Sequence, residues 1–311
     1  MPGAVTALLV GTALFYSRSL EEYIRKYPNA VVRRDHVATV ISVDPGFGKM
    51  ILVNGVGMTR LTPVTKFMAH LPLGFHHGRP ESALVICFGM GTSYRSVLSW
   101  DVQTTAVELV PSVKDAFGYY HADAAQLAQN PKGRIVADDG RRYLLRVADK
   151  YDVILIDPPP PVEAAGSSLL YSREFYELAK TRLKPGGILQ AWFPGGDKLV
   201  WQAVTRSVCE SFPHVRVFTS VEGWGAHYLA SMEPIDDLSP AQFLARLPER
   251  AKADLGEWRA VKDLGEWIAP LFSERLDVES VLNANPRIRI SDDRPFNEYF
   301  LLRYLGVYNP E

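Results

Sequence analysis

Four carboxylates in this sequence stand directly after short apolar runs, in positions where binding or acid–base chemistry is expected. Glu108 ends one run, Asp138 and Asp139 follow the next, and Asp157 ends a further run. If these runs are parallel strands of one sheet, their carboxyl ends meet in a single crevice. A carboxylate in that crevice can hold hydroxyl or amino groups, or accept a proton from a reacting amine.

A glycine turn precedes these acids. The run Ala83–Cys87 leads into Gly89-Met90-Gly91, and glycines there let the backbone approach a ligand closely. Glu108, at the end of the next run, is placed where a carboxylate takes the two ribose hydroxyls of a nucleoside. Tyr94 stands where a dinucleotide fingerprint has its third glycine, so the pattern predicts a single nucleoside rather than a dinucleotide.

A parallel sheet would bring these residues together. Continuous apolar runs alternate with segments long enough to be helices, as expected for strands that are covered on both faces. The sequence therefore predicts an α/β fold with a Rossmann-like, doubly wound, mostly parallel sheet. The predicted strands are Ala83–Cys87, Thr105–Leu109, Arg134–Ala137, Val153–Ile156 and Gly187–Trp192, with edge strands at Val215–Thr219 and Ala226–Ala230 and crossover helices at Ser93–Leu98, Val113–Leu127 and Ser172–Leu183.

The pattern divides the chain into four parts. Residues 1–35 are expected to form an N-terminal helix and lead-in, and residues 36–82 a small β-hairpin module with a helix at Pro63–Leu73. Residues 83–232 form the Rossmann-like nucleoside-binding catalytic domain, and residues 233–311 a helical C-terminal appendage.

Composition excludes several classes of protein. The formal net charge is −1 over 311 residues, so nothing favours a nucleic-acid partner. Cys87 and Cys209 are the only cysteines and fit neither a disulfide framework nor a metal site, which indicates a cytoplasmic protein without a metal. The apolar stretch Ala4–Phe15 is too short to span a bilayer by itself. It is either a packed N-terminal helix or the end of a membrane segment, in which case the chain is the cytosolic domain of a larger membrane protein; a homodimer is also compatible with the sequence.

Five segments of the sequence resemble spermidine synthases, the polyamine aminopropyltransferases, whose nucleotide domain has the class I methyltransferase-like form of the fold. The resemblance covers about half of the chain and implies that decarboxylated S-adenosylmethionine donates an aminopropyl group to a small-molecule amine, with no metal. The segments are Leu84–Gly91, Ala106–Val113, Val136–Leu144, Lys150–Asp157 and Leu170–Gly187.

The resemblance also implies roles for individual residues. Asp157 is the expected catalytic carboxylate, which faces the reacting amine and the sulfonium. Glu163 and Tyr171 are expected to lie on the acceptor side. The nucleoside would be held by Gly89, Gly91, Glu108, Asp138, Asp139 and Gly140, with Glu108 on the ribose and Asp139 on the adenine amino group.

The sequence departs from the family on the acceptor side. Pro160 stands where the family has a second acidic residue, Met58 where it has a glutamine, and Val64-Thr65-Lys66 where it has Tyr-His-Glu. An acidic cradle for a diamine is therefore missing, and Lys66 is expected to repel a diamine such as putrescine. The acids of the C-terminal tail, Asp292, Asp293 and Glu298, either replace the cradle by folding over the site or form a solvated turn.

Two other functions stay open. A methyltransferase would use intact S-adenosylmethionine with the same Glu108 and Asp139 contacts. A non-catalytic nucleoside-binding domain of a larger membrane protein would keep the fold without the reaction.

In an aminopropyltransferase or a methyltransferase, the loop Pro158–Ser168 is expected to act as a lid over the acceptor site. Prolines stiffen the first half of this loop, and Ala164–Ser168 is small enough to hinge.

Overall fold

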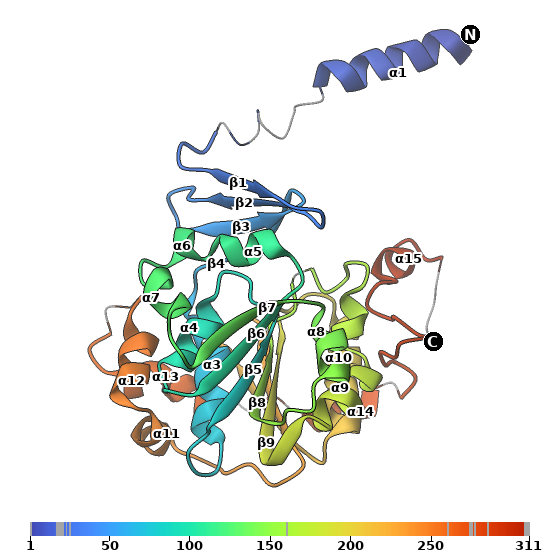
Figure 1. Ribbon diagram of the computed structural model, residues 1–311. Helices are drawn as coiled ribbons and strands as arrows, with labels where there is room; N and C mark the ends of the chain where they lie inside the picture. The colour runs from blue at the N-terminus through green and yellow to red at the C-terminus, as the bar shows by residue number, and fades with distance from the viewer. Residues whose placement is uncertain are drawn as a thin grey trace.

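The computed structural model describes residues 2–16, 22, 24, 26–159, 161–259, 261–273, 276, 278–284 and 286–307. Two sheets form its framework (Figure 1). The smaller sheet is antiparallel, and its Asn54-Gly55 hairpin turn has positive φ at both residues, 52° and 81°, as a type I′ turn requires. Its strands, in spatial order, are β1 (Val31–Arg34), β2 (Thr39–Val43), β3 (Met50–Val53) and β4 (Val56–Arg60). β1 thus lies inside the segment predicted as a lead-in.

The larger sheet has seven strands in the order β10-β11-β9-β8-β5-β6-β7. The five strands from β9 to β7 are parallel, and β10 and β11 extend the sheet with antiparallel pairing, which confirms the predicted doubly wound, mostly parallel sheet. Chain order reverses between β5 and β8, and ligands bind at such a switch point. The strands are β5 (Ser82–Ile86), β6 (Gln103–Glu108), β7 (Gly133–Ala137), β8 (Tyr151–Ile156), β9 (Leu183–Phe193), β10 (His214–Thr219) and β11 (Ala226–Ser231).

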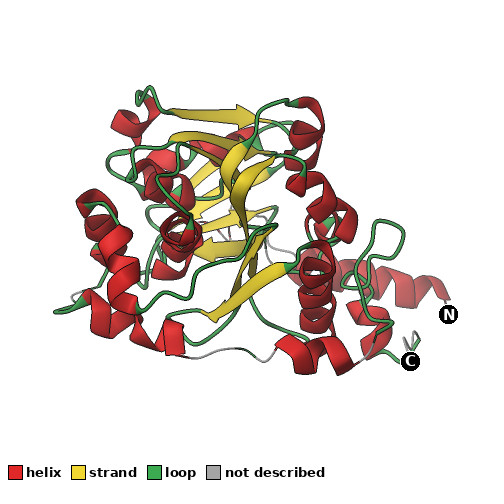
Figure 2. Ribbon diagram, turned by 90° about the horizontal axis from the view of Figure 1, so that it is seen from below, coloured by secondary structure: helices red, strands yellow, loops and turns green. Residues whose placement is uncertain are grey.

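Helices cover both faces of the larger sheet (Figure 2). One face carries α3 (Pro63–Phe75), α4 (Thr92–Leu98), α11 (Pro240–Arg246), α12 (Glu249–Gly256) and α13 (Leu264–Ser273). The other carries α8 (Gly140–Arg146), α9 (Arg173–Lys180), α10 (Lys198–Ser211) and α14 (Val278–Ala284). The predicted helix Val113–Leu127 is instead three short helices, α5 (Pro111–Asp115), α6 (Phe117–Tyr120) and α7 (Ala124–Ala128), and the chain also forms the 3-10 turn η1 (Ser167–Leu170) and α15 (Phe300–Tyr304).

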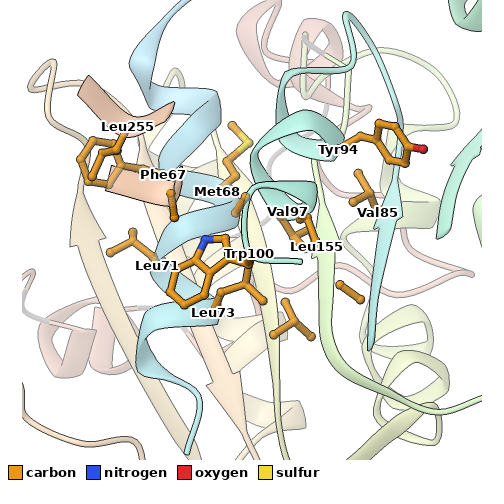
Figure 3. Close-up of a cluster of buried hydrophobic side chains, with 14 of the residues drawn as sticks. Phe67, Met68, Leu71, Leu73, Val85, Tyr94, Val97, Trp100, Leu155 and Leu255 are labelled. Atoms are coloured by element: carbon orange, nitrogen blue, oxygen red, sulfur yellow. The ribbon is translucent and has the colours of Figure 1, made fainter. Parts of the chain in front are cut away.

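Helix α3 belongs to the core of the larger sheet rather than to the β module. All thirteen of its residues are buried, because it lies between the sheet and the C-terminal helices. Figure 3 shows Phe67, Met68 and Leu71 of α3 in one cluster with Val97 and Leu155. The C-terminal helices therefore complete the hydrophobic core on this face.

The smaller sheet packs against the turn that follows β5. Met90 of that turn shares a buried cluster with Val40 and Ile51 of the small sheet and with Val113 of α5. This packing holds the glycine turn from its outer side, so the small sheet helps to position the predicted nucleoside site.

The apolar N-terminal segment forms helix α1 (Pro2–Tyr16), which extends away from the rest of the molecule (Figure 1). Leu8, Leu14 and Phe15 are more than two-thirds exposed, at 70%, 72% and 84%. Among the residues that the structure describes, no helix is long and apolar enough to cross a membrane.

Candidate functional site

The glycine turn leaves room for a ligand. Cys87, Gly89 and Gly91 have positive φ values of 69°, 54° and 81°, which carry the chain sharply from β5 into α4. A Cβ added to Gly91 would lie 2.4 Å from the ring of Phe117, so only glycine fits there. A Cβ added to Gly89 would meet nothing within 4 Å, so the space above this residue is open.

Glu108 lies beside the glycine turn at the end of β6, as predicted. Its Oε2 accepts hydrogen bonds from the amides of Phe88 (3.0 Å) and Gly89 (3.2 Å), and its Oε1 accepts one from Val110 (2.9 Å). The side chain is buried, and burial raises the pKa of its carboxyl against the effect of these amides. The hydrogen bonds fix the orientation of the carboxylate at the base of the turn.

Asp138 and Asp139 occupy different environments. Asp138 is buried and binds Arg142 and Arg146 of α8; burial raises the pKa of its carboxyl, but the hydrogen bond and charges of these arginines outweigh burial and lower it. Asp139 is partly exposed and caps α8, because its Oδ1 accepts the amide of Arg142 at 2.7 Å. A Cβ on Gly140 would lie 2.4 Å from Ile86, so this glycine allows α8 to approach β5.

Asp157 follows β8 directly beside the glycine turn, since its amide donates to the carbonyl of Ile86 at 3.1 Å. Burial, and then the charge of Glu108, raise the pKa of Asp157 to about 7, although a hydrogen bond from Ser93 opposes the change. A carboxyl with this pKa exchanges its proton near neutral pH.

Three of the predicted acids converge at the switch point. Val107 and Ile156 both pair with Ile86, so Glu108 and Asp157 flank Cys87 at the start of the turn, and Asp139 comes two residues after Ala137, the partner of Glu108. Burial, and then the charges of these three carboxylates, raise the pKa of the Cys87 thiol. Within the described part of the chain, no group of three or more His, Cys, Asp and Glu side chains could hold a metal ion.

Glu163 and Tyr171 lie on the β9 side of Asp157. The Oε1 of Glu163 would lie 3.5 Å from a Cβ added to Gly196, so its carboxylate reaches the loop after β9. Tyr171 is fully buried, and its hydroxyl donates to the carbonyl of Trp192 at 3.1 Å. Tyr171 therefore supports the end of β9, and Glu163 reaches the loop that follows this strand.

Two of the residues at which the sequence departs from the family lie outside the part of the chain that the structure describes. Pro160 and the side chain of Met58 lie among the parts that the structure leaves undescribed. Lys66, in contrast, is fully buried; its Nζ lies 2.6 Å from Glu257 and 3.3 Å from Asp254, both of which follow or belong to α12. These carboxylates compensate its charge, so the expected repulsion between Lys66 and a diamine is wrong.

The C-terminal acids reach the site but are engaged by neighbours. Asp292 binds Arg141 and accepts a hydrogen bond from the hydroxyl of Ser172 at 2.7 Å. Glu298 accepts the amide of Ser168 at 3.1 Å, whereas Asp293 is exposed. The tail folds onto the predicted lid loop without offering an unengaged acidic cradle there.

Sequence patterns do not single out Glu222, which two tryptophan rings connect to the strand beside Asp157. Because Ile156 pairs with Ala191, Trp192 follows at the level of Asp157 on the neighbouring strand. The ring of Trp224 lies 5.6 Å from that of Trp192, and its Nε1 donates to Glu222 at 3.2 Å. Glu222 stands in the loop between two edge strands, where residue type and spacing alone do not distinguish it from a solvated glutamate.

A doubly wound, mostly parallel sheet with a glycine turn and three acids at its switch point is a Rossmann-like α/β domain, a fold in which ligands bind at that point. Residues 61–221, just over half of the chain, match the family model described as the spermine/spermidine synthase domain. The chain belongs to this family, which confirms the resemblance seen in the sequence and identifies it as a transferase.

Curated relatives and solved structures agree with this assignment. A polyamine aminopropyltransferase of Sulfurisphaera tokodaii is 28% identical over 209 residues, which cover 63% of this chain and 67% of the relative. A polyamine aminopropyltransferase 2 of Hyperthermus butylicus is 30% identical over 216 residues, which cover 65% and 68%. The crystal structure of spermidine synthase from Thermotoga maritima has a TM-score of 0.59 at 25% identity and covers 73% of this chain and 87% of that one.

Proposed function

We propose that this protein transfers the aminopropyl group of decarboxylated S-adenosylmethionine to the amine of a small-molecule acceptor. One observation carries the proposal: Glu108, Asp139 and Asp157 follow neighbouring strands around the turn after β5, where open space lies above Gly89. The names of the curated relatives, all polyamine aminopropyltransferases, support the same reaction.

The nucleoside is assigned to the first three strand ends. Glu108 would take the two ribose hydroxyls, and the exposed part of Asp139 the adenine amino group. Gly89 and Gly91 would lie beneath the nucleoside, because their conformations keep side chains out of that space. Asp138, through its arginine partners, and Gly140, through its close contact with Ile86, would fix the turn that presents Asp139.

Asp157 is assigned to the reacting amine. A neutral amine attacks the aminopropyl carbon that is bonded to the sulfonium sulfur. The bond between this carbon and sulfur breaks, its electron pair goes to sulfur, and methylthioadenosine leaves. The new nitrogen–carbon bond leaves a positive charge on nitrogen. The nitrogen then loses a proton to Asp157 and becomes neutral. A pKa of about 7 suits this proton acceptor at neutral pH, and the negative carboxylate also stabilises the cationic donor.

The charges around the site favour the decarboxylated donor. Intact S-adenosylmethionine carries a carboxylate, which would approach Asp157 and Glu108. The arginines of α8 nearest the site do not compensate for this, because Arg141 binds Asp292 while Arg142 and Arg146 bind Asp138. The aminopropyl ammonium of the decarboxylated donor, in contrast, is attracted by the same carboxylates.

On the acceptor side, we assign the approach of the amine to the space between Asp157 and Glu163. Tyr171 would support the end of β9 beside this space, since its hydroxyl donates a hydrogen bond to the carbonyl of Trp192. Asp292 and Glu298 are engaged by the tail contacts, and Glu222 lies between Arg259 (3.7 Å) and Arg60 (3.9 Å). With Glu163 assigned to the reacting amine, none of these three offers an unengaged carboxylate to the second ammonium of putrescine, and Pro160 stands where the family has an acidic residue. An acceptor other than putrescine is therefore proposed.

Calorimetry with three ligands tests the donor assignment. We expect methylthioadenosine and decarboxylated S-adenosylmethionine to bind, and the intact form to bind at least about tenfold more weakly, which corresponds to about 1.4 kcal/mol. Equal or tighter binding of intact S-adenosylmethionine would contradict the donor assignment and favour methyl transfer.

A further inference from the structure

We propose that the segment Ile290–Glu298, called the C-terminal strap below, positions the acceptor-side loop Val162–Ser168 beside Asp157. The strap lies beyond the part of the chain that matches the family model, which ends at residue 221. It follows α14 and precedes α15, on the side of the molecule that carries α8, α9 and α10 (Figure 1). The kinetic part of this inference rests on the proposed function, and the structural part does not.

The end of the strap is bonded directly to both ends of the loop. Asn297 is fully buried, and its Nδ2 donates to the carbonyl of Val162 at 2.6 Å and to the hydroxyl of Ser167 at 2.8 Å. The next residue, Glu298, accepts the amide of Ser168 at 3.1 Å. Two adjacent strap residues thus close the loop on itself, because they join residues at its beginning and at its end.

The start of the strap is anchored to the helices of the α8–α10 face. The carbonyl of Ile290 accepts the amide of Arg173 at 3.1 Å, and its amide donates to the hydroxyl of Ser207 at 3.2 Å. Asp292 binds Arg141 in the first turn of α8 and the hydroxyl of Ser172. These contacts fix the strap to rigid elements, so it can hold the loop in a defined place.

Buried apolar side chains make the same connection. Ile290 and Phe296 of the strap are fully buried in one cluster with Val162 of the loop and Ile156 of β8. Ile156 is the residue directly before Asp157. The strap, the loop and the strand that carries the proposed proton acceptor therefore pack as one unit.

The loop has few means of fixing itself. Its approach contains Pro158, Pro159 and Pro161, which lack an amide N–H for hydrogen bonding. Gly166 adopts a positive φ of 84°, and Ala164 and Ala165 offer no polar side chain. Within the loop, the hydroxyl of Ser167 donates to the carbonyl of Val162, and the strap adds the hydrogen bonds that tie this pair to the rest of the molecule. Asn297 is a positioning residue in this sense.

Three variants of the full chain test the inference. Asn297→Ala removes the buried donor to the loop, and Glu298→Gln leaves the size of the partly exposed side chain unchanged while it weakens the contact with Ser168. Asp293→Asn is the matched control, because Asp293 lies in the same strap, is exposed and bonds the hydroxyl of Ser291. Each variant is compared with the unchanged protein in methylthioadenosine binding, in hydrogen exchange of residues 162–168, and in kcat and KM for the acceptor.

We expect Asn297→Ala to speed exchange in residues 162–168 by at least about tenfold, because the loop loses two buried hydrogen bonds. The acceptor kcat/KM should fall by at least about tenfold, while methylthioadenosine binding stays within about threefold. Glu298→Gln should change the same readouts in the same direction to a smaller extent, and Asp293→Asn should leave them as in the unchanged protein.

Unchanged loop exchange in both Asn297→Ala and Glu298→Gln would overturn the inference. Equal losses of nucleoside binding and acceptor turnover would overturn it too, since they would show a general loss of structure. If Asn297→Ala does not fold, Glu298→Gln decides. If the unchanged protein shows no aminopropyl transfer, the proposed function fails, and the exchange measurement still decides whether the strap holds the loop.

Discussion

Replacement of Asp157 by asparagine is expected to stabilise the protein at pH 8 while it removes the proton acceptor. The folded structure raises the pKa of this carboxyl from 3.8 to about 7, chiefly by burial. Between these two values the folded state binds a proton that the unfolded state has released, so the free energy of unfolding falls as the pH rises through this window. An asparagine carries no charge and is free of this loss.

The size of the effect follows from the pKa change. A change of about 3 corresponds to about 4 kcal/mol in full, at about 1.36 kcal/mol for each tenfold change in proton affinity. Asp157 is partly exposed, and solvent screening reduces this value, so we expect a gain of about 1–3 kcal/mol at pH 8. The carboxyl is protonated in both states only below about pH 3, so most of the gain should be lost by pH 4 and the rest below pH 3.

Urea unfolding of the unchanged protein and the variant at pH 4 and pH 8 measures this gain. Asp152→Asn, at the opposite end of β8, is the matched control with the opposite sign. Burial acts to raise the pKa of Asp152, but hydrogen bonds from Lys184 and from the amides of Glu81 and Ser82 outweigh it and lower the pKa, so this carboxylate contributes stability above its unfolded pKa, and its loss should destabilise the protein at pH 8.

A less stable Asp157→Asn protein at pH 8 would refute the reasoning. It would show that neighbours stabilise the carboxylate and that its pKa is not raised. In that case Asp157 would be a weak base at neutral pH, and its assignment as the proton acceptor would fall.

Three further outcomes are expected. Glu108→Ala should weaken methylthioadenosine binding at least about tenfold, since a charge-assisted contact is worth about 1.5–3 kcal/mol, and unchanged binding in a folded protein would remove the ribose assignment. Putrescine should be a poor acceptor of the decarboxylated donor, and turnover at about 1 per second or faster would show that a carboxylate serves its second ammonium. Ala165 and Gly166, which lie between the parts of the loop that the strap holds, should become protected from hydrogen exchange when methylthioadenosine binds; equal exchange in both states would identify a static loop rather than a lid.

The sequence predicts those parts of the fold that depend on local pattern. The central strands of the larger sheet are continuous apolar runs, and each predicted strand overlaps a strand of the structure, although Cys87 and Leu109 lie one residue past the ends of β5 and β6. Within the predicted helical appendage, no apolar period marks helix α12 itself, because its buried side includes Asp254, whose partners Lys66 and Arg95 come from distant helices. A polar residue in a buried stripe weakens the apolar periodicity by which helices are recognised.

The site shows the same division between local and distant contacts. Glu108 and Asp157 are predictable because each ends an apolar run, and a parallel sheet brings such ends together. The hydrogen bond between Asn297 and Val162 joins residues far apart in the chain, and no rule of residue spacing predicts it. The neutralisation of Lys66 by Asp254 and Glu257 is of the same kind, which explains why its expected effect on a diamine was wrong.

The most direct test is to identify the nucleoside product. The protein is incubated with a panel of amines and either decarboxylated or intact S-adenosylmethionine, and the products are separated by chromatography and identified by mass. Aminopropyl transfer predicts that methylthioadenosine forms from the decarboxylated donor only when an amine is present, together with an amine heavier by one aminopropyl group, and that Asp157→Asn slows its formation at least about a hundredfold. Formation of S-adenosylhomocysteine from the intact donor, with no methylthioadenosine from the decarboxylated one, would contradict the proposed function.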